Sequence, residues 1–350
     1  MKRCSRTLGS LLLVFLALML LLVGCTPTRP QPSAGPQDQV IKIRLGHNQD
    51  TNSPQHHGAE AFKEKVAELS HGRLQVTIYP NMQLGQMREQ AEQVQNGTLE
   101  MTEQPASVLS NFAPALEAYD LPFLFANTKA LHSVVTGPVG QALLKKLEEK
   151  GLVGLGYETG GLKHITANFP VHTPADLKGK KMRVMPAPIL IETYKALGAN
   201  PTPVEYGELY NALQQGVVDG QENPLQTVVM LKLYEVQKNL TLTGNGPMLY
   251  LTVANKKWFD ALPADLQQNI RDAMAYADGI VWDEIIQGEK AYLKEIQAHG
   301  MQVYVPSAGD LAAFRAATQP VVAFVAKRVG QDIVTELQQA AAQANSRETK

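Results

Sequence analysis

The sequence predicts an α/β fold in which helices cover a mainly parallel sheet. From about Val40 onward, short runs rich in β-branched residues alternate with longer segments of helical periodicity. About 310 residues follow the N-terminal segment, which is too many for one ordinary core and suits two domains. Since no cysteine occurs after Cys25, packing must stabilise this part without disulfides or a cysteine metal site.

The first predicted unit begins with a strand at 41–47 and a helix at 53–69, whose apolar residues fall on one face. A second strand closes at the turn Pro80-Asn81, and Asn96-Gly97 ends the next helix. The other elements expected in this unit are strands at 73–79, 99–102 and 151–158, helices at about 86–95 and 129–150, and an apolar loop at 121–125.

The second predicted unit begins near Gly160-Gly161. Residues 263–299 read as one helix of unusual length, which suggests that it spans both domains. The segment 219–224 is expected to be an amide-rich loop between two helices. The remaining elements are strands at 164–168, 181–185, near 240, 249–254 and 301–305, and helices at about 188–197, 205–215 and 308–343.

The N-terminus predicts secretion. Lys2, Arg3 and Arg6 precede an apolar run at 11–23, which suits a signal peptide and is too short for a spanning helix. The block Leu22-Val23-Gly24-Cys25 resembles the lipobox of bacterial lipoproteins. We therefore expect a signal peptide at 1–24, lipidation of Cys25, and a proline-rich linker at 25–39 that tethers a periplasmic or extracytoplasmic body to the membrane. The alternative is an ordinary signal peptide with a chance cysteine.

Charge and motifs exclude several function classes. Removal of the signal peptide shifts the formal charge from −1 to −4, and the body has no long basic run, so nucleic-acid binding is not expected. His56, His57 and Glu60 could be drawn as metal ligands, but a solvated helix start is the favoured interpretation. The sequence lacks the common hydrolase, metalloprotease and phosphate-loop motifs. We expect no cofactor, no metal and no enzymatic activity.

Two polar residues of the second unit stand out. Arg183 lies in a strand between Met182 and Val184, so it is either a surface residue or a pocket donor. Its planar guanidinium suits a carboxylate, because it offers two parallel donors. Asn223 can donate and accept hydrogen bonds, or it can cap a helix that begins at Pro224.

Several ordered segments resemble one family. They are Asp176–Met185, Leu197–Val204, Glu208–Pro224, Tyr79–Gly85 and Ala118–Phe125. From about 41 to 329 the chain is similar to the solute-binding subunits of tripartite ATP-independent periplasmic (TRAP) transporters, which include dicarboxylate- and sialate-binding proteins. The resemblance implies an α/β, two-domain periplasmic binding protein, a type II-like jaw with crossing strands and a long domain-spanning helix. It also implies domain I at 40–160 plus about 249–288, and domain II at 161–248 plus about 289–345.

The resemblance also implies site residues. Arg183 would form the main salt bridge to a ligand carboxylate, and Asn223 would hold the same group. Many relatives carry a second arginine where this chain has Lys163, which can make a point contact with a second carboxylate or a hydroxyl. Sugar acids, C4 dicarboxylates and small oxo or hydroxy acids stay open as ligands. The other expected contacts are Tyr206, Asn48, Gln86 and Gln104.

The implied function is capture of an organic acid and its delivery to the membrane subunits of a TRAP transporter. The expected partners are thus a small organic-acid ligand, the TRAP membrane subunits and, through the lipid anchor, the membrane. The alternatives are a receptor for an ATP-driven importer or a sensor kinase, and a periplasmic enzyme.

Overall fold

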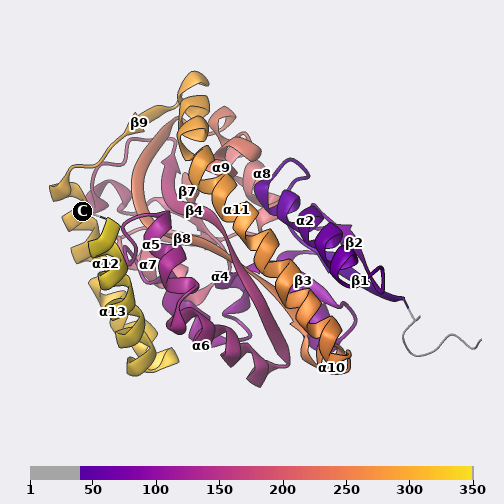
Figure 1. Ribbon diagram of the computed structural model, residues 1–350. Coiled ribbons are helices and arrows are strands. Elements are labelled where there is room, and N and C mark those ends of the chain that lie inside the picture. Colours follow the sequence, from indigo (N-terminus) through magenta and orange to yellow (C-terminus); the bar gives the residue numbers. More distant parts are fainter. Residues whose placement is uncertain (1–39, 349–350) are drawn as a thin grey trace, which may run out of the picture. The chain divides into compact units, whose positions relative to one another are not determined.

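The computed structural model describes residues 40–348, so the expected signal peptide and lipidated linker lie outside the described residues. Its nine strands form one sheet in the order β2-β1-β3-β8-β4-β7-β5-β6, with β9 paired to β8 (Figure 1). The strands are β1 (Ile41–Gly46), β2 (Leu74–Tyr79), β3 (Met101–Pro105), β4 (Leu152–Ala167), β5 (Lys181–Val184), β6 (Asn200–Pro203), β7 (Gly220–Asn223), β8 (Asn239–Asn255) and β9 (Gln302–Tyr304).

Helices flank this sheet, and no helix within residues 40–348 is long and apolar enough to cross a membrane. The α-helices are α2 (Pro54–Leu69), α3 (Met87–Asn96), α4 (Ala106–Leu109), α5 (Thr128–Val135), α6 (Pro138–Lys146), α7 (Pro188–Ala196), α8 (Leu209–Gln214), α9 (Leu225–Met230), α10 (Lys256–Asp260), α11 (Ala264–Ala298), α12 (Ala308–Val329) and α13 (Gln331–Glu348). The 3₁₀ helices are η1 (Pro114–Asp120), η2 (Leu147–Lys150), η3 (Pro174–Leu177), η4 (Tyr206–Glu208) and η5 (Leu233–Glu235).

Two long antiparallel strands, β4 and β8, occupy the middle of the sheet. β3 pairs with the carboxyl-terminal part of β8, and β7 pairs with the carboxyl-terminal part of β4. The outer pairings β1–β2, β1–β3, β5–β6 and β5–β7 are parallel, as the alternation of strands and helices predicts. The sheet is therefore parallel toward both ends and antiparallel at its centre.

The sequence prediction divided each central strand into two. Gly160-Gly161 looked like a boundary, but the chain passes through it as a bulge, with a register shift between Thr159 and Gly161. Gly161 has a φ of +97°, which explains the glycine at that position. The separate strands predicted at 151–158 and 164–168 are thus one strand of 16 residues, and those near 240 and at 249–254 form one of 17.

The long helix predicted at 263–299 is confirmed as α11, with 35 residues. It packs against α2 and β4 and, toward its other end, against α9 (Figure 1). Its first part covers an apolar cluster that includes Phe62 and Ile270, and its last turns cover a second cluster that includes Leu213 and Ile296. One helix therefore buries apolar surface from both parts of the sheet.

Three other predictions were wrong in detail. The helix at 129–150 is split at Gly137-Pro138, because a proline lacks the N–H needed inside a helix and begins α6 instead. The helix at 308–343 is divided at Gly330 into α12 and α13. The loop expected at 219–224 contains strand β7, and Pro224 rather than Asn223 is the N-cap of α9, so the capping interpretation of Asn223 was also wrong.

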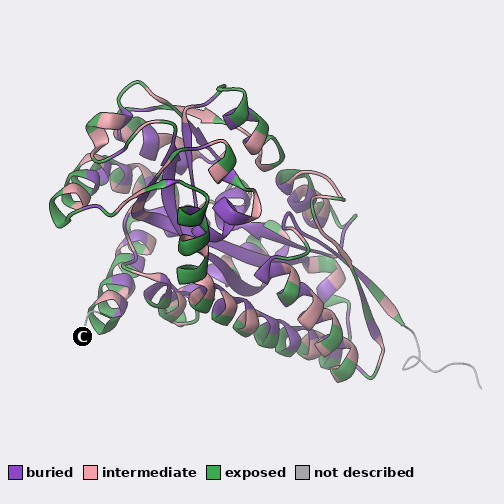
Figure 2. Ribbon diagram, turned by 90° about the horizontal axis from the view of Figure 1, so that it is seen from above, coloured by how far each residue is buried: buried purple, intermediate pink, exposed green. Residues whose placement is uncertain are grey.

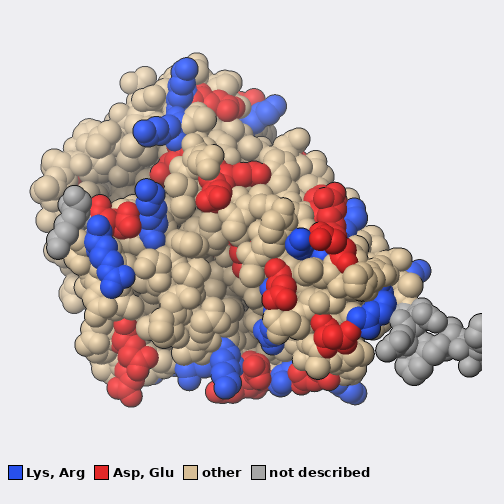
Figure 3. Space-filling model, in the orientation of Figure 1, with Lys and Arg blue, Asp and Glu red and all other residues tan. Residues whose placement is uncertain are grey.

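Buried residues are concentrated in the central strands β3, β4, β7 and β8 and on the inward faces of the helices (Figure 2), whereas β6 and β9 contain no buried residue. On the face shown in Figure 3, acidic and basic side chains are interspersed, as the small formal charge of −1 suggests.

Two buried glutamates lie side by side on neighbouring parts of the central sheet. Glu103 of β3 and Glu158 of β4 are both 2% exposed, and each carboxyl group affects the pKa of the other. Burial raises the pKa of Glu103 to about 8, and burial together with the charges of Glu103 and Asp278 raises the pKa of Glu158 well above its usual value.

The pair predicts a loss of stability as the pH rises. Because the folded pKa values are raised above the ordinary value of 4.5, the unfolded chain releases its protons first, and the free energy of unfolding falls from about pH 4.5 to 8. Glu158→Gln mimics the protonated acid and should therefore reduce the fall in Tm between pH 5 and pH 8. Thermal unfolding followed by circular dichroism measures this, with the exposed Glu68→Gln as control. An unchanged pH dependence in Glu158→Gln would contradict the expectation.

Candidate ligand-binding site

Arg183 is a buried cation with a free donor. It lies in β5, opposite Thr202 of β6 and Gln221 of β7, and only 1% of it is exposed. Its Nε donates to the carbonyl oxygen of Val204 at 2.9 Å, whereas its buried Nη2 has no hydrogen-bond partner. Burial lowers its pKa to about 10, which leaves it charged at neutral pH. The surface alternative is excluded, and an anionic acceptor would satisfy the unpaired donor.

Asn223 stands on the neighbouring strand. It is two residues from Gln221 on β7, so both side chains lie on one face of that strand, and Gln221 is opposite Arg183. Asn223 Nδ2 donates to Gln221 Oε1, and Gln221 Nε2 donates to Thr166 Oγ1 at 2.8 Å. Both amides are buried. The chain of hydrogen bonds fixes the orientation of the Asn223 amide beside Arg183.

Lys163 is already paired with two carboxylates. Its Nζ lies 2.8 Å from Glu222 Oε1 and 3.3 Å from Asp120 Oδ1, and all three side chains are at most 3% exposed. Burial lowers the pKa of Lys163, but Glu222 and Asp120 together outweigh burial and raise it. Ser107 Oγ donates to Asp120 Oδ2 at 2.6 Å and Tyr194 Oη to Glu222 Oε2 at 3.3 Å. At most one of the three ammonium hydrogens therefore remains for a ligand.

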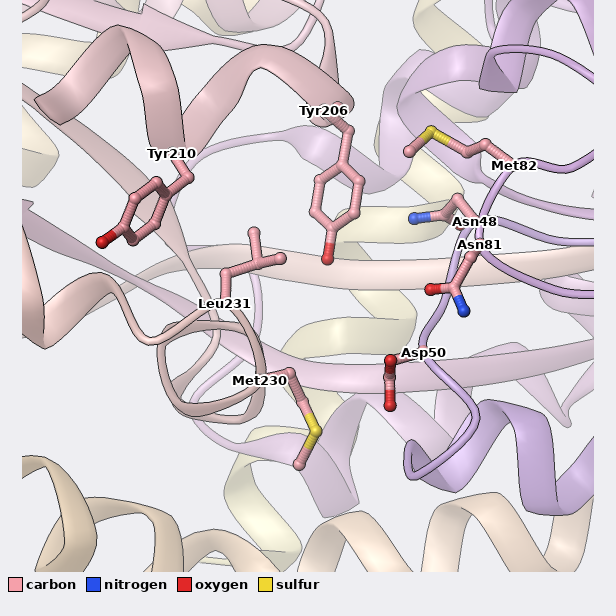
Figure 4. A pocket seen from close by; sticks show the side chains of 9 residues that line it. Asn48, Asp50, Asn81, Met82, Tyr206, Tyr210, Met230 and Leu231 are labelled. Atoms are coloured by element: carbon pink, nitrogen blue, oxygen red, sulfur yellow. The ribbon is translucent and has the colours of Figure 1, made fainter. Parts of the chain in front are cut away.

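A cavity of about 210 Å³ opens between two sets of elements. One wall comes from the turns after β1 and β2, and the other from η4, α8 and α9. Figure 4 shows the Tyr206 hydroxyl pointing into the space between these walls. Tyr206 is close enough to Arg183 and Asp50 for both to affect its pKa, which burial raises. The lining residues are Asn48, Asp50, Asn81, Met82, Tyr206, Gly207, Tyr210, Met230 and Leu231.

The turn after β1 is fixed by a pair of histidines. Gln49 N donates to His47 Nδ1 at 3.1 Å, so the hydrogen of this neutral ring is on Nε2, which lies 3.1 Å from His56 Nδ1. Burial lowers the pKa of His47 to about 3. Gln49 Nε2 in turn donates to Tyr250 Oη at 2.6 Å. These contacts hold the backbone that carries Asn48 and Asp50.

The three amides predicted from the first half occupy different places. Asn48 lines the cavity, and neither of its buried amide atoms has a partner of normal geometry. Gln86 lies against η4, since a Cβ placed on Gly207 would be 3.3 Å from Gln86 Nε2. Gln104 is fully buried on β3 and donates to Thr102 Oγ1 at 2.8 Å. The Oε1 atoms of Gln86 and Gln104 have no partner.

The sequence analysis missed Asp50 and Asn81. Both follow the carboxyl ends of parallel strands, β1 and β2, which is where open α/β sheets place their ligands. That rule, applied to the two predicted strands, would have identified both residues. Arg183, Asn223, Lys163, Gln86 and Gln104 are not among the lining residues of the cavity.

Two sets of elements on a shared pair of central strands, with a cavity of mixed polar and apolar lining between them, are the architecture of a solute-binding protein. The chain belongs to the family of bacterial extracellular solute-binding proteins, family 7, which matches residues 45–328. It is therefore the solute-binding subunit of a TRAP transporter, which binds a small organic acid and works with the membrane subunits of that transporter. It is not an enzyme.

Relatives cover nearly the whole chain. The C4-dicarboxylate-binding periplasmic protein DctP of Rhodobacter capsulatus is 35% identical over 330 residues, 92% of this chain and 97% of that protein. The sugar acid binding protein DctPAm of Advenella mimigardefordensis, solved with galactonate, has a TM-score of 0.84 at 34% identity and covers 87% of this chain and 99% of its own. A TRAP solute-binding protein of Desulfovibrio salexigens, solved with orotic acid, has a TM-score of 0.83 at 35% identity with the same coverage.

The pairing of Lys163 predicts a structural cost for its removal. Lys163→Met leaves Asp120 and Glu222 buried without their cation, which costs about 3–5 kcal/mol and should lower Tm by roughly 5–8 °C. Lys195→Met removes a lysine from an exposed ion pair with Glu192 and should change Tm little. Glu222→Gln added to Lys163→Met should restore part of the loss. A Tm for Lys163→Met equal to that of the wild type would show that the pairing does not stabilise the fold.

Proposed function

We propose that the protein holds its organic acid by one carboxylate, with Arg183 as the main counter-charge and Asn223 beside it. The observation that carries this proposal is the buried, unpartnered Nη2 of Arg183. A buried cationic donor without an acceptor costs free energy, and a ligand carboxylate removes that cost while forming two parallel hydrogen bonds.

Five further residues complete the proposed site. Tyr206 and Asn48 line the cavity from opposite walls, and Gln86 meets the same region through η4. Gln104 offers an unpaired acceptor from β3. Lys163 contributes its one remaining donor to a hydroxyl or carboxylate oxygen. All five are polar groups that can orient a hydroxylated or acidic ligand.

The proposed ligand is enclosed by two domains with the boundaries expected from the sequence: domain I at 40–160 plus about 249–288, and domain II at 161–248 plus about 289–345. In support, the half of β4 before Gly160 pairs with the last part of β8, and the half after it pairs with the first part of β8. The cavity walls come from elements on either side of these strands. Ligand contacts with both walls would favour a closed jaw.

The named ligands of the relatives support an organic acid. C4 dicarboxylates, galactonate and orotic acid differ in size and in the number of hydroxyl groups, but each carries a carboxylate. A carboxylate is the feature that Arg183 can recognise in all three. Because the relatives bind different classes of acid, they do not determine which class this chain binds.

We also propose that the body is tethered to the membrane by a diacylglyceryl group on Cys25. The lipobox-like block Leu22–Cys25 and the proline-rich linker that follows support this. A tether would keep the receptor close to the membrane subunits to which it delivers its ligand.

Arg183→Ala should weaken binding about thirtyfold to several thousandfold, because truncating one partner of a buried charge pair costs about 2–5 kcal/mol. Arg183→Lys should remain poor, since an ammonium cannot form two parallel hydrogen bonds to a carboxylate. A thermal-shift screen of organic acids identifies the ligand, and calorimetry then measures affinity.

The matched control is Arg44→Ala, which removes an arginine from an exposed ion pair with Glu100 and should leave affinity unchanged. Unliganded Arg183→Ala should lose some stability, because it removes the hydrogen bond from Nε to Val204 O and a fully buried side chain, so circular dichroism checks that the variant is folded. Wild-type affinity in a folded Arg183→Ala protein would remove Arg183 from the site.

Cys25→Ser should block lipidation and leave an unprocessed or mislocalised precursor. Membrane fractionation and mass spectrometry of the mature N-terminus measure this. Cys4→Ser is the control, since Cys4 lies within the expected signal peptide and should have no effect. Normal maturation and normal membrane partition of the Cys25→Ser protein would contradict the lipid anchor.

A further inference from the structure

We propose that the ligand is a polyhydroxylated acid with a single carboxylate, and that Asp50 determines this specificity by rejecting a second carboxylate. The inference deepens the proposed function and rests on it, since it takes Arg183 as the anchor of the first carboxylate. It distinguishes between ligand classes that the relatives leave open.

The buried charges around Arg183 provide a counter-charge for only one ligand carboxylate. Arg183 and Lys163 are the only lysine or arginine residues buried within residues 40–348. Lys163 is shared between Asp120 and Glu222, so the formal charges of these four groups sum to zero before any ligand binds. One ligand carboxylate has Arg183 as its partner. A second carboxylate would find no unpaired buried cation among the described residues.

The charge on the cavity wall also favours a ligand with a single carboxylate. Asp50 is the only charged residue that lines the cavity, and it has no ion-pair partner within residues 40–348. Asn52 donates to Asp50 Oδ1 from its backbone N at 2.9 Å and from its side chain at 2.8 Å, which fixes the carboxylate on the cavity wall (Figure 4). A ligand hydroxyl can donate to Asp50, whereas a ligand carboxylate beside Asp50 meets a like charge.

Buried amide oxygens without a hydrogen-bond donor also favour a hydroxylated ligand. Asn48 Oδ1, Gln86 Oε1 and Gln104 Oε1 are buried and accept no hydrogen bond. Only a donor can satisfy them, and an ionised carboxylate has none. Asn48 also has an unpartnered Nδ2, so its amide can accept from one hydroxyl and donate to another. A ligand hydroxyl can satisfy an acceptor of this kind, whereas an ionised second acid group cannot.

The test uses ligands that differ by one group. Aldonates of four to six carbons, including galactonate, are compared by calorimetry with the matching aldarates, in which the terminal CH₂OH is a carboxylate, and with succinate. The tightest aldonate should bind at least tenfold more tightly than its aldarate and than succinate. Asp50→Asn should reduce the aldonate-to-aldarate ratio at least threefold, because it removes the like charge. Asp272→Asn, on the exposed face of α11, is the matched control and should leave the ratio unchanged.

An aldarate or succinate that binds as tightly as the best aldonate would overturn the inference, as would failure of every aldonate to bind. An unchanged ratio in Asp50→Asn would also overturn the role of Asp50. The proposed function fails in a different way. It is contradicted if the alditol, which lacks the carboxylate, binds as tightly as its aldonate, or if Arg183→Ala keeps the wild-type affinity.

Discussion

The antiparallel pairing of β4 with β8 is the constraint on which the rest of the structure depends. Each strand is a partner for a different parallel group, β3 on one side and β7 on the other. The strands are buried along almost their whole length, so neither can shift register without exposing core residues. The turns that carry Asn48 and the strands that carry Arg183 and Asn223 take their positions from this pair.

The two buried cations, Lys163 and Arg183, differ in how far their hydrogen bonds are satisfied. Lys163, Asp120 and Glu222 satisfy one another, and Ser107 and Tyr194 complete their hydrogen bonds. Arg183 has one donor bound to Val204 and another without an acceptor. Because an incomplete buried charge costs free energy, such a group persists where a binding partner completes it.

Periodic features were predictable from the sequence. The apolar pattern predicted α11 within one residue at each end, and the short strand around Arg183 was also located correctly. Strand β7 was not predictable, because Gly-Gln-Glu-Asn has little β propensity and becomes a strand only through pairing with β4 and β5. The partners of Lys163 lie 43 and 59 residues away, which no local pattern reveals. Asp50 and Asn81 were accessible to sequence reasoning through their positions after parallel strands.

The continuity of α11 has a mechanical consequence. At about 1.5 Å per residue, its 35 residues form a rod roughly 50 Å long. A rod of unbroken backbone hydrogen bonds resists stretching and twisting far more than gentle bending. Since α11 is packed along both parts of the sheet, its stiffness opposes displacement of one part relative to the other along the helix axis.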